Sequence, residues 1–270
     1  MADATPPPAP RRRRSLALTA AVLVPLVPIV IALLLSGGGG GTATAVTTQA
    51  TSPFSVVGAA PKPHRPSVAL PGGRGSLVAL LERPTGMRTS PGGRVFTRLQ
   101  TKTQFGSPDA MWVVRVHGRW LGVVSPQAGN NHLGWIPASS ASLSRVDWEL
   151  RVALDARRLT VLRAGHVVER FTVAVGAPQA PTPTGRFAVT DRLLTGDPSG
   201  PYGCCILALS AQAPHAIQDW SGGDRIAIHS TPETETIGEA VSHGCVRLTL
   251  AEGRWLVNHI PLGTPTVITS

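Results

Sequence analysis

Apolar and polar positions divide the chain into one long apolar run near the N-terminus and many short alternating segments after it. The run from Ser15 to Leu35 carries no charge and follows four consecutive arginines, Arg11 to Arg14. About 20 apolar residues suffice to cross a bilayer as a helix, and basic residues tend to stay on the cytoplasmic side. We therefore expect residues 1–14 to be a cytoplasmic basic tail and residues 15–35 a transmembrane anchor.

Two other interpretations of this segment also place the rest of the chain outside the cytoplasm. Ala43-Thr44-Ala45 offers a signal-peptidase site, although the apolar run is longer than the roughly 7 to 15 residues usual in a cleaved signal peptide. Arg13-Arg14 weakly resembles a twin-arginine export signal. We favour the uncleaved anchor, which predicts a single-pass protein of the bacterial cell membrane whose C-terminal domains face the cell wall.

Residues 36–75 read as a linker of Gly, Thr, Ala and Pro. Five consecutive glycines, Gly37 to Gly41, open it, and Pro61, Pro63 and Pro66 come near its end. Gly-rich segments are flexible and Pro-rich segments are stiffer. This composition predicts a tether that holds the folded domains away from the membrane.

Residues 76–146 alternate between apolar and polar positions over short distances. The segments 112–116 and 119–124 read as two strands joined by a tight turn at His117-Gly118, and 134–137 reads as a further short strand. This pattern resembles bacterial SH3-like domains, which are small barrels. The resemblance implies contact with a wall polymer, and we expect Trp112, Trp120 and Trp135 to be core residues of the barrel.

Residues 147–270 show a more regular strand pattern. Ala164-Gly165 is a hairpin turn, and Thr249 with Glu252 forms a capping box for a helix that continues to His259. The expected strands cover residues 149–154, 159–163, 166–175, 185–190 and 266–269. The first four predict an antiparallel sheet, so the fold class is mostly β with one or two short helices.

Composition and charge exclude several classes of protein. Gly (29 residues) and Pro (25) are abundant and aromatic residues make up 4%, which argues against long helical bundles. The net charge of +10 comes from the tail and the middle segment, whereas residues 148–270 are nearly neutral. We therefore expect no nucleic-acid partner.

The candidate chemistry lies between Arg225 and Arg247. A buried-strand pattern ends at His229-Ser230, and Ser242-His243-Gly244-Cys245-Val246-Arg247 follows, with Cys245 sixteen positions after His229. A cysteine attacks as a thiolate, so it needs an imidazole to take its proton and surroundings that stabilise the sulfur anion. Gly244 lets backbone amides approach a reacting carbonyl. The arrangement predicts acyl transfer.

This motif resembles the signature of the L,D-transpeptidase catalytic domain of the YkuD type. The segments 181–187 and 263–267 resemble two further stretches of the family, so the likeness covers nearly all of residues 148–270. The resemblance implies a YkuD-type β-sandwich, no metal or organic cofactor, and peptidoglycan stem peptides as substrates.

The resemblance also implies roles for individual residues. Cys245 would attack the third-residue carbonyl of a donor tetrapeptide stem, release D-Ala and form a thioester that an amine of a second stem cleaves. His229 would be the general base, and Ser230 would fix its tautomer through its carbonyl or hydroxyl. Carbapenems would acylate the same cysteine.

The remaining motif residues would serve the intermediate and the substrate. His243, Gly244 and Cys245 would supply amides to the oxyanion, with the His243 side chain near the substrate. Arg247 would bind a stem carboxylate through its two-pronged guanidinium, and Ser242 would assist in substrate binding.

Other functions remain open for these residues. An L,D-carboxypeptidase would use the same residues with water as the acceptor, and a silent domain would act only as a wall anchor. A zinc site of His229, His243 and Cys245 has no close ligand pair in its favour. For Cys204-Cys205 we favour packed or free thiols over a disulfide, because adjacent Cα atoms lie closer than ordinary disulfide geometry requires. The remaining histidines, among them His166, His215 and His259, read as surface or satisfied core residues.

Overall fold

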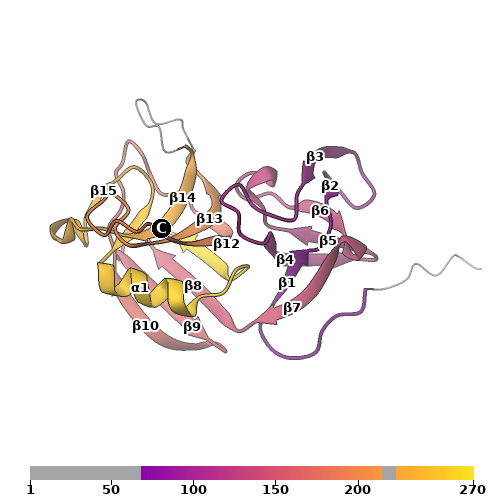
Figure 1. The fold of residues 1–270 in the computed structure, drawn as a ribbon, viewed down its shortest axis with the longest axis horizontal. Helices are drawn as coiled ribbons and strands as arrows, with labels where there is room; N and C mark the ends of the chain where they lie inside the picture. Colours follow the sequence, from indigo (N-terminus) through magenta and orange to yellow (C-terminus); the bar gives the residue numbers. More distant parts are fainter. Residues whose placement is uncertain (1–67, 215–222) are drawn as a thin grey trace, which may run out of the picture. The chain divides into compact units, whose positions relative to one another are not determined.

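The computed structural model describes residues 68–214 and 223–270 (Figure 1). The expected tail, the expected anchor at residues 15–35 and most of the expected linker lie outside the described residues. Among the residues described, no helix is long and apolar enough to span a membrane. Everything described below belongs to one compact unit within residues 61–270.

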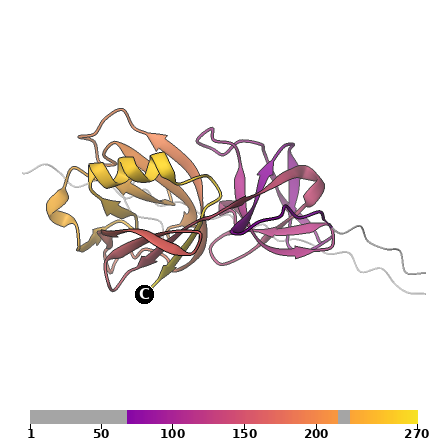
Figure 2. The same ribbon diagram turned by 90° about the horizontal axis from the view of Figure 1, so that it is seen from below.

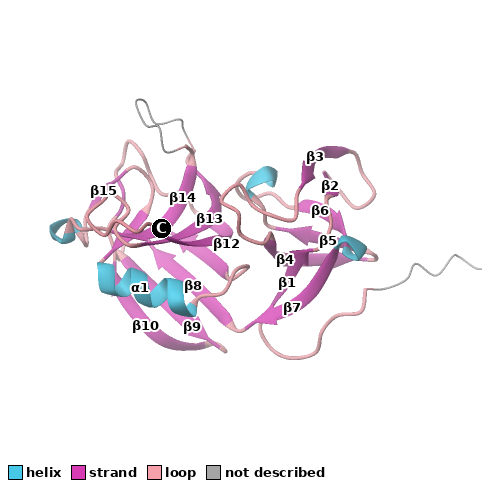
Figure 3. Ribbon diagram, viewed as in Figure 1, coloured by secondary structure: helices cyan, strands magenta, loops and turns pink. Residues whose placement is uncertain are grey.

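Strands make up most of the described chain (Figure 3). The first sheet has seven of them in the order β3-β2-β6-β5-β4-β1-β7, and all neighbours are antiparallel. The strands are β1 (Ser76–Leu81), β2 (Thr85–Arg88), β3 (Val95–Leu99), β4 (Ala110–His117), β5 (Trp120–Val123), β6 (Gly134–Pro137) and β7 (Ala141–Val146), with 3-10 turns η1 (Pro126–Ala128) and η2 (Ala138–Ser140). The predicted hairpin is confirmed, since His117 pairs with Trp120 across a turn in which Gly118 has a φ of 56°.

The core of the first sheet is aliphatic rather than aromatic. Met87, Met111 and Leu121 are among its fully buried side chains. Trp120 is buried as predicted, but the expectation is wrong for Trp112 and Trp135, which are half-buried. The alternation along β4 explains the difference for Trp112, because its neighbours Met111 and Val113 take the inward face.

The second sheet has eight strands in the order β10-β9-β8-β17-β12-β13-β14-β16, and a separate parallel pair joins β11 to β15. The strands are β8 (Trp148–Ala153), β9 (Arg158–Arg163), β10 (His166–Thr172), β11 (Val175–Gly176), β12 (Gly185–Leu194), β13 (Cys205–Gln212), β14 (Arg225–Ser230), β15 (Ala240–Ser242), β16 (Val246–Leu248) and β17 (Pro265–Thr269). One 3-10 turn, η3 (Thr234–Thr236), and one α-helix, α1 (Leu250–His259), complete this part.

The second sheet is mixed, which corrects the expectation of an antiparallel sheet. Strands β8, β9 and β10 are antiparallel as predicted, but β17 lies between β8 and β12 and runs parallel to β8. Strand β16 runs parallel to β14. Alternation marks which residues form strands but does not fix which strand is a neighbour, so the insertion of the C-terminal strand could not be read locally.

Strand β12 lies between β17 and β13 in the second sheet and pairs with both. Its residues 185–188 pair with β17, and after an irregularity at Thr190 its residues 191–194 pair with β13. A strand that changes partners in this way lets a sheet fold over a core. That core includes Leu150, Phe187, Leu209 and Ile228, all buried.

Helix α1 closes this core on one side (Figures 1 and 2). The predicted capping box is present: Thr249 Oγ1 accepts from the Glu252 amide, and the Glu252 carboxylate accepts from the Thr249 amide at 2.9 Å. Leu256 is fully buried, and the ring of Trp255 makes edge-to-face contacts with Trp148 of β8 and Phe171 of β10. The helix therefore contacts strands far apart in the sequence.

The two adjacent cysteines form a disulfide, which corrects the expectation of packed or free thiols. Cys204 and Cys205 are bonded to each other, and both are buried, 5% and 1% exposed. The usual Cα separation applies to cysteines from different parts of a chain, whereas neighbours can close a small ring through their own peptide bond. Cys245 is the one free cysteine in the described chain.

Candidate active site

The register of β14 and β16 brings the predicted nucleophile and base together. These strands are parallel, and His229 pairs with Arg247. Cys245 comes directly before β16. The Arg247 cation acts on the pKa of both His229 and Cys245, so the register sets the two predicted residues around one side chain although sixteen positions separate them.

His229 is buried and neutral. It is 3% exposed, and its Nδ1 lies 2.8 Å from the carbonyl oxygen of Ser230. Because a carbonyl can only accept, Nδ1 carries the proton and Nε2 is left as the basic nitrogen. The pKa of His229 is lowered to about 4. Burial is the main cause and the Arg247 cation acts in the same direction, while hydrogen bonds to the backbone of Ser230 and Tyr202 oppose the shift.

Cys245 is half-buried and keeps its proton at rest. Burial raises the pKa of its thiol above the ordinary 9.0, against smaller opposing effects of a hydrogen bond to the Ala227 backbone and of the Arg247 cation. The expectation that the surroundings favour the thiolate is therefore wrong for the resting site, because desolvation penalises the anion more than the nearby donors stabilise it.

The loop before Cys245 is fixed by Ser242 and by a glycine. The Ser242 hydroxyl donates to the Cys245 carbonyl at 2.5 Å and accepts from the Gly244 amide at 3.1 Å. Gly244 has a φ of 111°, which disfavours any other residue, and a Cβ there would lie 2.9 Å from Ile226. Ser242 is 1% exposed, so its hydroxyl positions the loop, whereas the sequence analysis expected it to contact substrate. The Gly244 amide already donates a hydrogen bond to Ser242 within the loop.

Arg247 is placed for an anion but has a partner already. One guanidinium nitrogen lies 3.2 Å from the exposed carboxylate of Glu233. Its Nε is buried and has no hydrogen-bond partner among the described residues. A substrate carboxylate therefore competes with Glu233 for Arg247.

A residue that the sequence analysis missed, Tyr202, stands beside His229. The two ring centroids are 5.0 Å apart and meet edge to face. Tyr202, Arg225, His243 and Cys245 are among the residues that line a small cavity of about 20 Å³. His243 is exposed. Tyr202 is the single tyrosine of the chain, and its sequence context gave no other signal.

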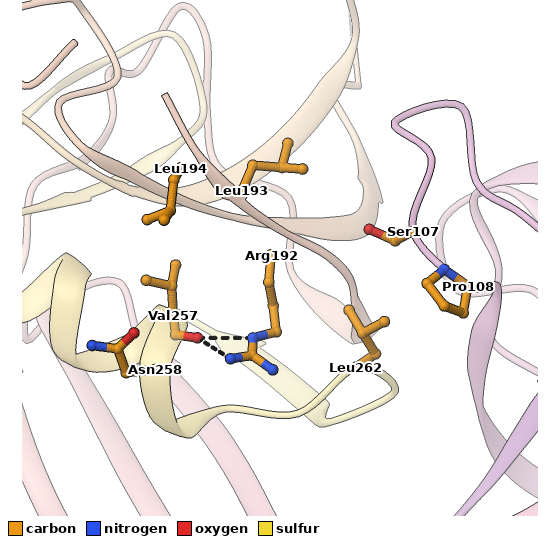
Figure 4. A pocket seen from close by; sticks show the side chains of 8 residues that line it. All are labelled: Ser107, Pro108, Arg192, Leu193, Leu194, Val257, Asn258 and Leu262. Carbon is orange, nitrogen blue, oxygen red and sulfur yellow. Dashed lines mark hydrogen bonds between the residues drawn. The ribbon is translucent and has the colours of Figure 1, made fainter. Parts of the chain in front are cut away.

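Other candidate sites do not compete with this one. The described residues contain no group of three or more His, Cys, Asp or Glu that could hold a metal. A larger hollow of about 360 Å³ lies at Arg192 and Leu194, away from Cys245 (Figure 4). There the Arg192 guanidinium donates to the carbonyl of Val257 in α1, so the cation already stabilises the C-terminal end of the helix.

Comparisons with known proteins identify the family of the C-terminal domain. Residues 147–268 match the model of the YkuD family, described as an L,D-transpeptidase catalytic domain. A Bacillus licheniformis protein named as an L,D-transpeptidase, YkuD, is 31% identical over 46% of this chain and 67% of its own length. Its Bacillus subtilis namesake is 31% identical over 46% of this chain and 66% of its own length.

A solved L,D-transpeptidase from Mycobacterium smegmatis aligns with 56% of this chain and 90% of that chain, with a TM-score of 0.36 and 20% identity. The chain spans about two thirds of the length of the two Bacillus relatives. On the family model and the Bacillus matches, this chain belongs to the YkuD family of L,D-transpeptidases.

Proposed function

We propose that this protein is a peptidoglycan L,D-transpeptidase that uses Cys245 as nucleophile and His229 as general base. The observation that supports the proposal is the pairing of β14 with β16, which sets Arg247, two residues after the half-buried Cys245, opposite a neutral His229 with a fixed tautomer. A thiol and an imidazole in this arrangement transfer acyl groups.

Acylation begins from the neutral pair. As the Cys245 sulfur attacks the carbonyl between the third stem residue and D-Ala, its proton passes to Nε2 of His229. The imidazolium then gives that proton to the leaving amine. The C–N bond breaks, D-Ala departs, and a thioester to Cys245 remains.

Deacylation reverses the proton movements. An amine of a second stem attacks the thioester, His229 takes the proton of that amine, and the thiol leaves with a proton returned by His229. The product is an amide between two third-position residues. The energy of the cleaved amide is kept in the thioester, so the reaction needs no cofactor.

Backbone amides hold the negative charge on the substrate oxygen. Of the three expected donors, the Gly244 amide is committed to Ser242, so our proposal assigns this role to the amides of His243 and Cys245. Burial of the pocket strengthens such hydrogen bonds by excluding water.

Arg247 binds a carboxylate of the donor stem. Its buried Nε has no partner among the described residues, and its ion pair with exposed Glu233 is of the kind worth only about 0–1 kcal/mol. A stem carboxylate that binds two guanidinium nitrogens can displace Glu233.

The remaining predicted parts support the same function. In this proposal residues 15–35 hold the protein in the bacterial membrane, residues 36–75 span the distance to the wall, and residues 76–146 form an SH3-like domain that contacts a wall polymer. The uncharged run after Arg11 to Arg14 supports the anchor, and the confirmed 112–124 hairpin supports the small β domain.

The test is to incubate the full-length protein in detergent with purified disaccharide tetrapeptide and to weigh the products. Transpeptidation gives a dimer that has lost one D-Ala, whereas hydrolysis gives a tripeptide stem and would make the protein an L,D-carboxypeptidase. Cys245→Ala should give neither product. Ser210→Ala, which changes a buried serine of β13, should give the same product as the wild-type protein at the same rate. Unchanged substrate with the wild-type protein would refute the proposal.

A further inference from the structure

The Cys204–Cys205 disulfide lies at the start of β13, the strand that pairs with the His229 strand β14. Ile206, the residue after the pair, is opposite His229 in the pairing of β13 with β14. Both cysteines are buried, and neither has a part in the acyl-transfer steps. Their position therefore calls for a reason other than the chemistry of Cys245.

Ser230 joins the disulfide to His229. Its hydroxyl oxygen accepts a hydrogen bond from the Cys205 amide at 3.1 Å and lies 3.5 Å from the sulfur of Cys204. Its carbonyl oxygen is the one that fixes the His229 tautomer. One residue thus contacts the disulfide with its side chain and the base with its backbone.

Tyr202 is a second connection between this segment and His229. Its ring meets the His229 ring edge to face, and its backbone also hydrogen-bonds the histidine. Gly203, between Tyr202 and the disulfide, packs closely against Ser230, since a Cβ at this position would lie 2.6 Å from the Ser230 hydroxyl. Movement of Cys204 is therefore transmitted to both contacts of His229.

The disulfide also leaves little room for a reduced pair. The sulfur of Cys204 lies 3.5 Å from the carbonyl of Leu250, the first residue of α1, and 3.5 Å from the Ser230 hydroxyl. Two thiol sulfurs do not stay at bonding distance, so reduction must move at least one of them inside a close-packed interior.

We propose that the Cys204–Cys205 disulfide is a positioning element of the active site, which holds Tyr202 and Ser230 against His229 and makes acylation of Cys245 sensitive to reduction. In the reductive step a dithiol gives two electrons and two protons. The S–S bond breaks, two S–H bonds form, and the dithiol closes to its own disulfide. The inference rests on the proposed function only where acylation is the readout.

The test compares oxidised and reduced full-length protein, the latter treated with dithiothreitol and freed of it under nitrogen. Thiol titration of unfolded samples should find one thiol before reduction and three after it. Carbapenem acylation of Cys245, followed by intact mass, should slow about ten- to a hundredfold on reduction, the size expected when a catalytic group shifts by about 1 Å. Reoxidation should restore the rate.

Nitrogen NMR of labelled histidine gives a readout that needs no substrate. In the oxidised protein His229 should show one tautomer, protonated on Nδ1, with a pKa near 4. Reduction should mix the tautomers and raise that pKa towards 6.5. A structural role alone would lower the melting temperature without moving either signal.

Variants separate the route through Ser230 from a general effect. Cys204→Ala/Cys205→Ala should behave as the reduced protein and ignore dithiothreitol. Ser230→Ala should weaken the response to reduction, whereas Ser210→Ala, which removes another buried hydroxyl of the same domain, should keep it.

The proposal is overturned if the purified protein already has three thiols, or if reduction changes neither the acylation rate nor the His229 signals. Should the oxidised protein fail to be acylated at all, the proposed function fails, and the NMR comparison still decides whether the disulfide positions His229.

Discussion

The reactivity of Cys245 towards a simple alkylating agent should follow the pH dependence of a buried neutral thiol. Its pKa lies above 9.0 and that of His229 near 4. Both shifts disfavour the charged forms, so the resting site holds a neutral thiol and a neutral imidazole in preference to a thiolate–imidazolium pair.

Iodoacetamide labelling followed by intact mass measures this directly. The rate should rise with pH throughout the range from 6 to 9, because fewer than about one thiol in a hundred is ionised at pH 7. His229→Ala should change this rate little, since no imidazolium stabilises the sulfur. The same variant should slow acylation by a stem peptide or carbapenem about 10²- to 10⁴-fold, the usual contribution of a general base.

A labelling rate that is flat from pH 5.5 to 8, and that falls sharply in His229→Ala, would refute this reasoning. It would show a preformed ion pair and a low thiol pKa. Cys245→Ala is the control, and it should not be labelled without reduction, because Cys204 and Cys205 are bonded to each other.

Further outcomes are expected for substrate binding, for stability and for the N-terminal segment. Arg247→Lys should lower the apparent affinity for the donor stem more than it lowers turnover, because lysine keeps the charge and loses the two-pronged geometry. Glu233→Gln should raise that affinity about twofold, because it removes a carboxylate that competes for Arg247 through a weak ion pair. Asp109 is buried, and burial together with Asp191 raises its pKa to about 6. Asp109→Asn should therefore stabilise the fold at pH 7.5 by up to about 3 kcal/mol in urea unfolding and have no effect below about pH 3, where both states are protonated. Protein beginning at Ser76 should be soluble without detergent and as active as the full chain, whereas full-length protein should stay in the membrane fraction after a high-salt wash.

The opposite sign is expected for His229. Its pKa in the folded state is below the ordinary 6.5, so the unfolded chain binds a proton that the folded chain refuses between pH 6.5 and about 4. The contribution of His229 to the free energy of unfolding is therefore fully present above pH 6.5 and is lost as the pH falls from 6.5 to about 4. In the same protein Asp109 gives the reverse slope, so only variants of each residue separate the two.

Local features of the fold were predictable because they depend on neighbours in the sequence. The helix start at Thr249 follows from a side chain and a backbone amide three residues apart, and the turns at Gly118 and Gly165 follow from residues that accept positive φ. The position of β17 between β8 and β12 depends on pairs of residues that lie 77 to 116 positions apart, which alternation cannot reveal.

Residue types and spacing were enough to propose the nucleophile and the base, but not their charge state. The motif around Cys245 and the strand ending at His229 were sufficient to predict acyl transfer, since that chemistry depends on which groups meet. Their protonation depends on burial by Tyr202 and β13, residues that only the folded chain brings near. For the same reason Ser242 was assigned to substrate, although its hydroxyl is enclosed by the loop it holds.

At the proposed location outside the cytoplasm, a neutral resting pair has a consequence for the enzyme. A thiolate exposed there would meet oxidants and electrophiles continuously, and thiolates are oxidised and alkylated far faster than thiols. With the proton kept on Cys245, the sulfur becomes a strong nucleophile only when a bound stem carbonyl can accept its electrons and His229 can accept its proton. Substrate specificity and protection of the sulfur then arise from the same desolvation, which a lower thiol pKa would remove.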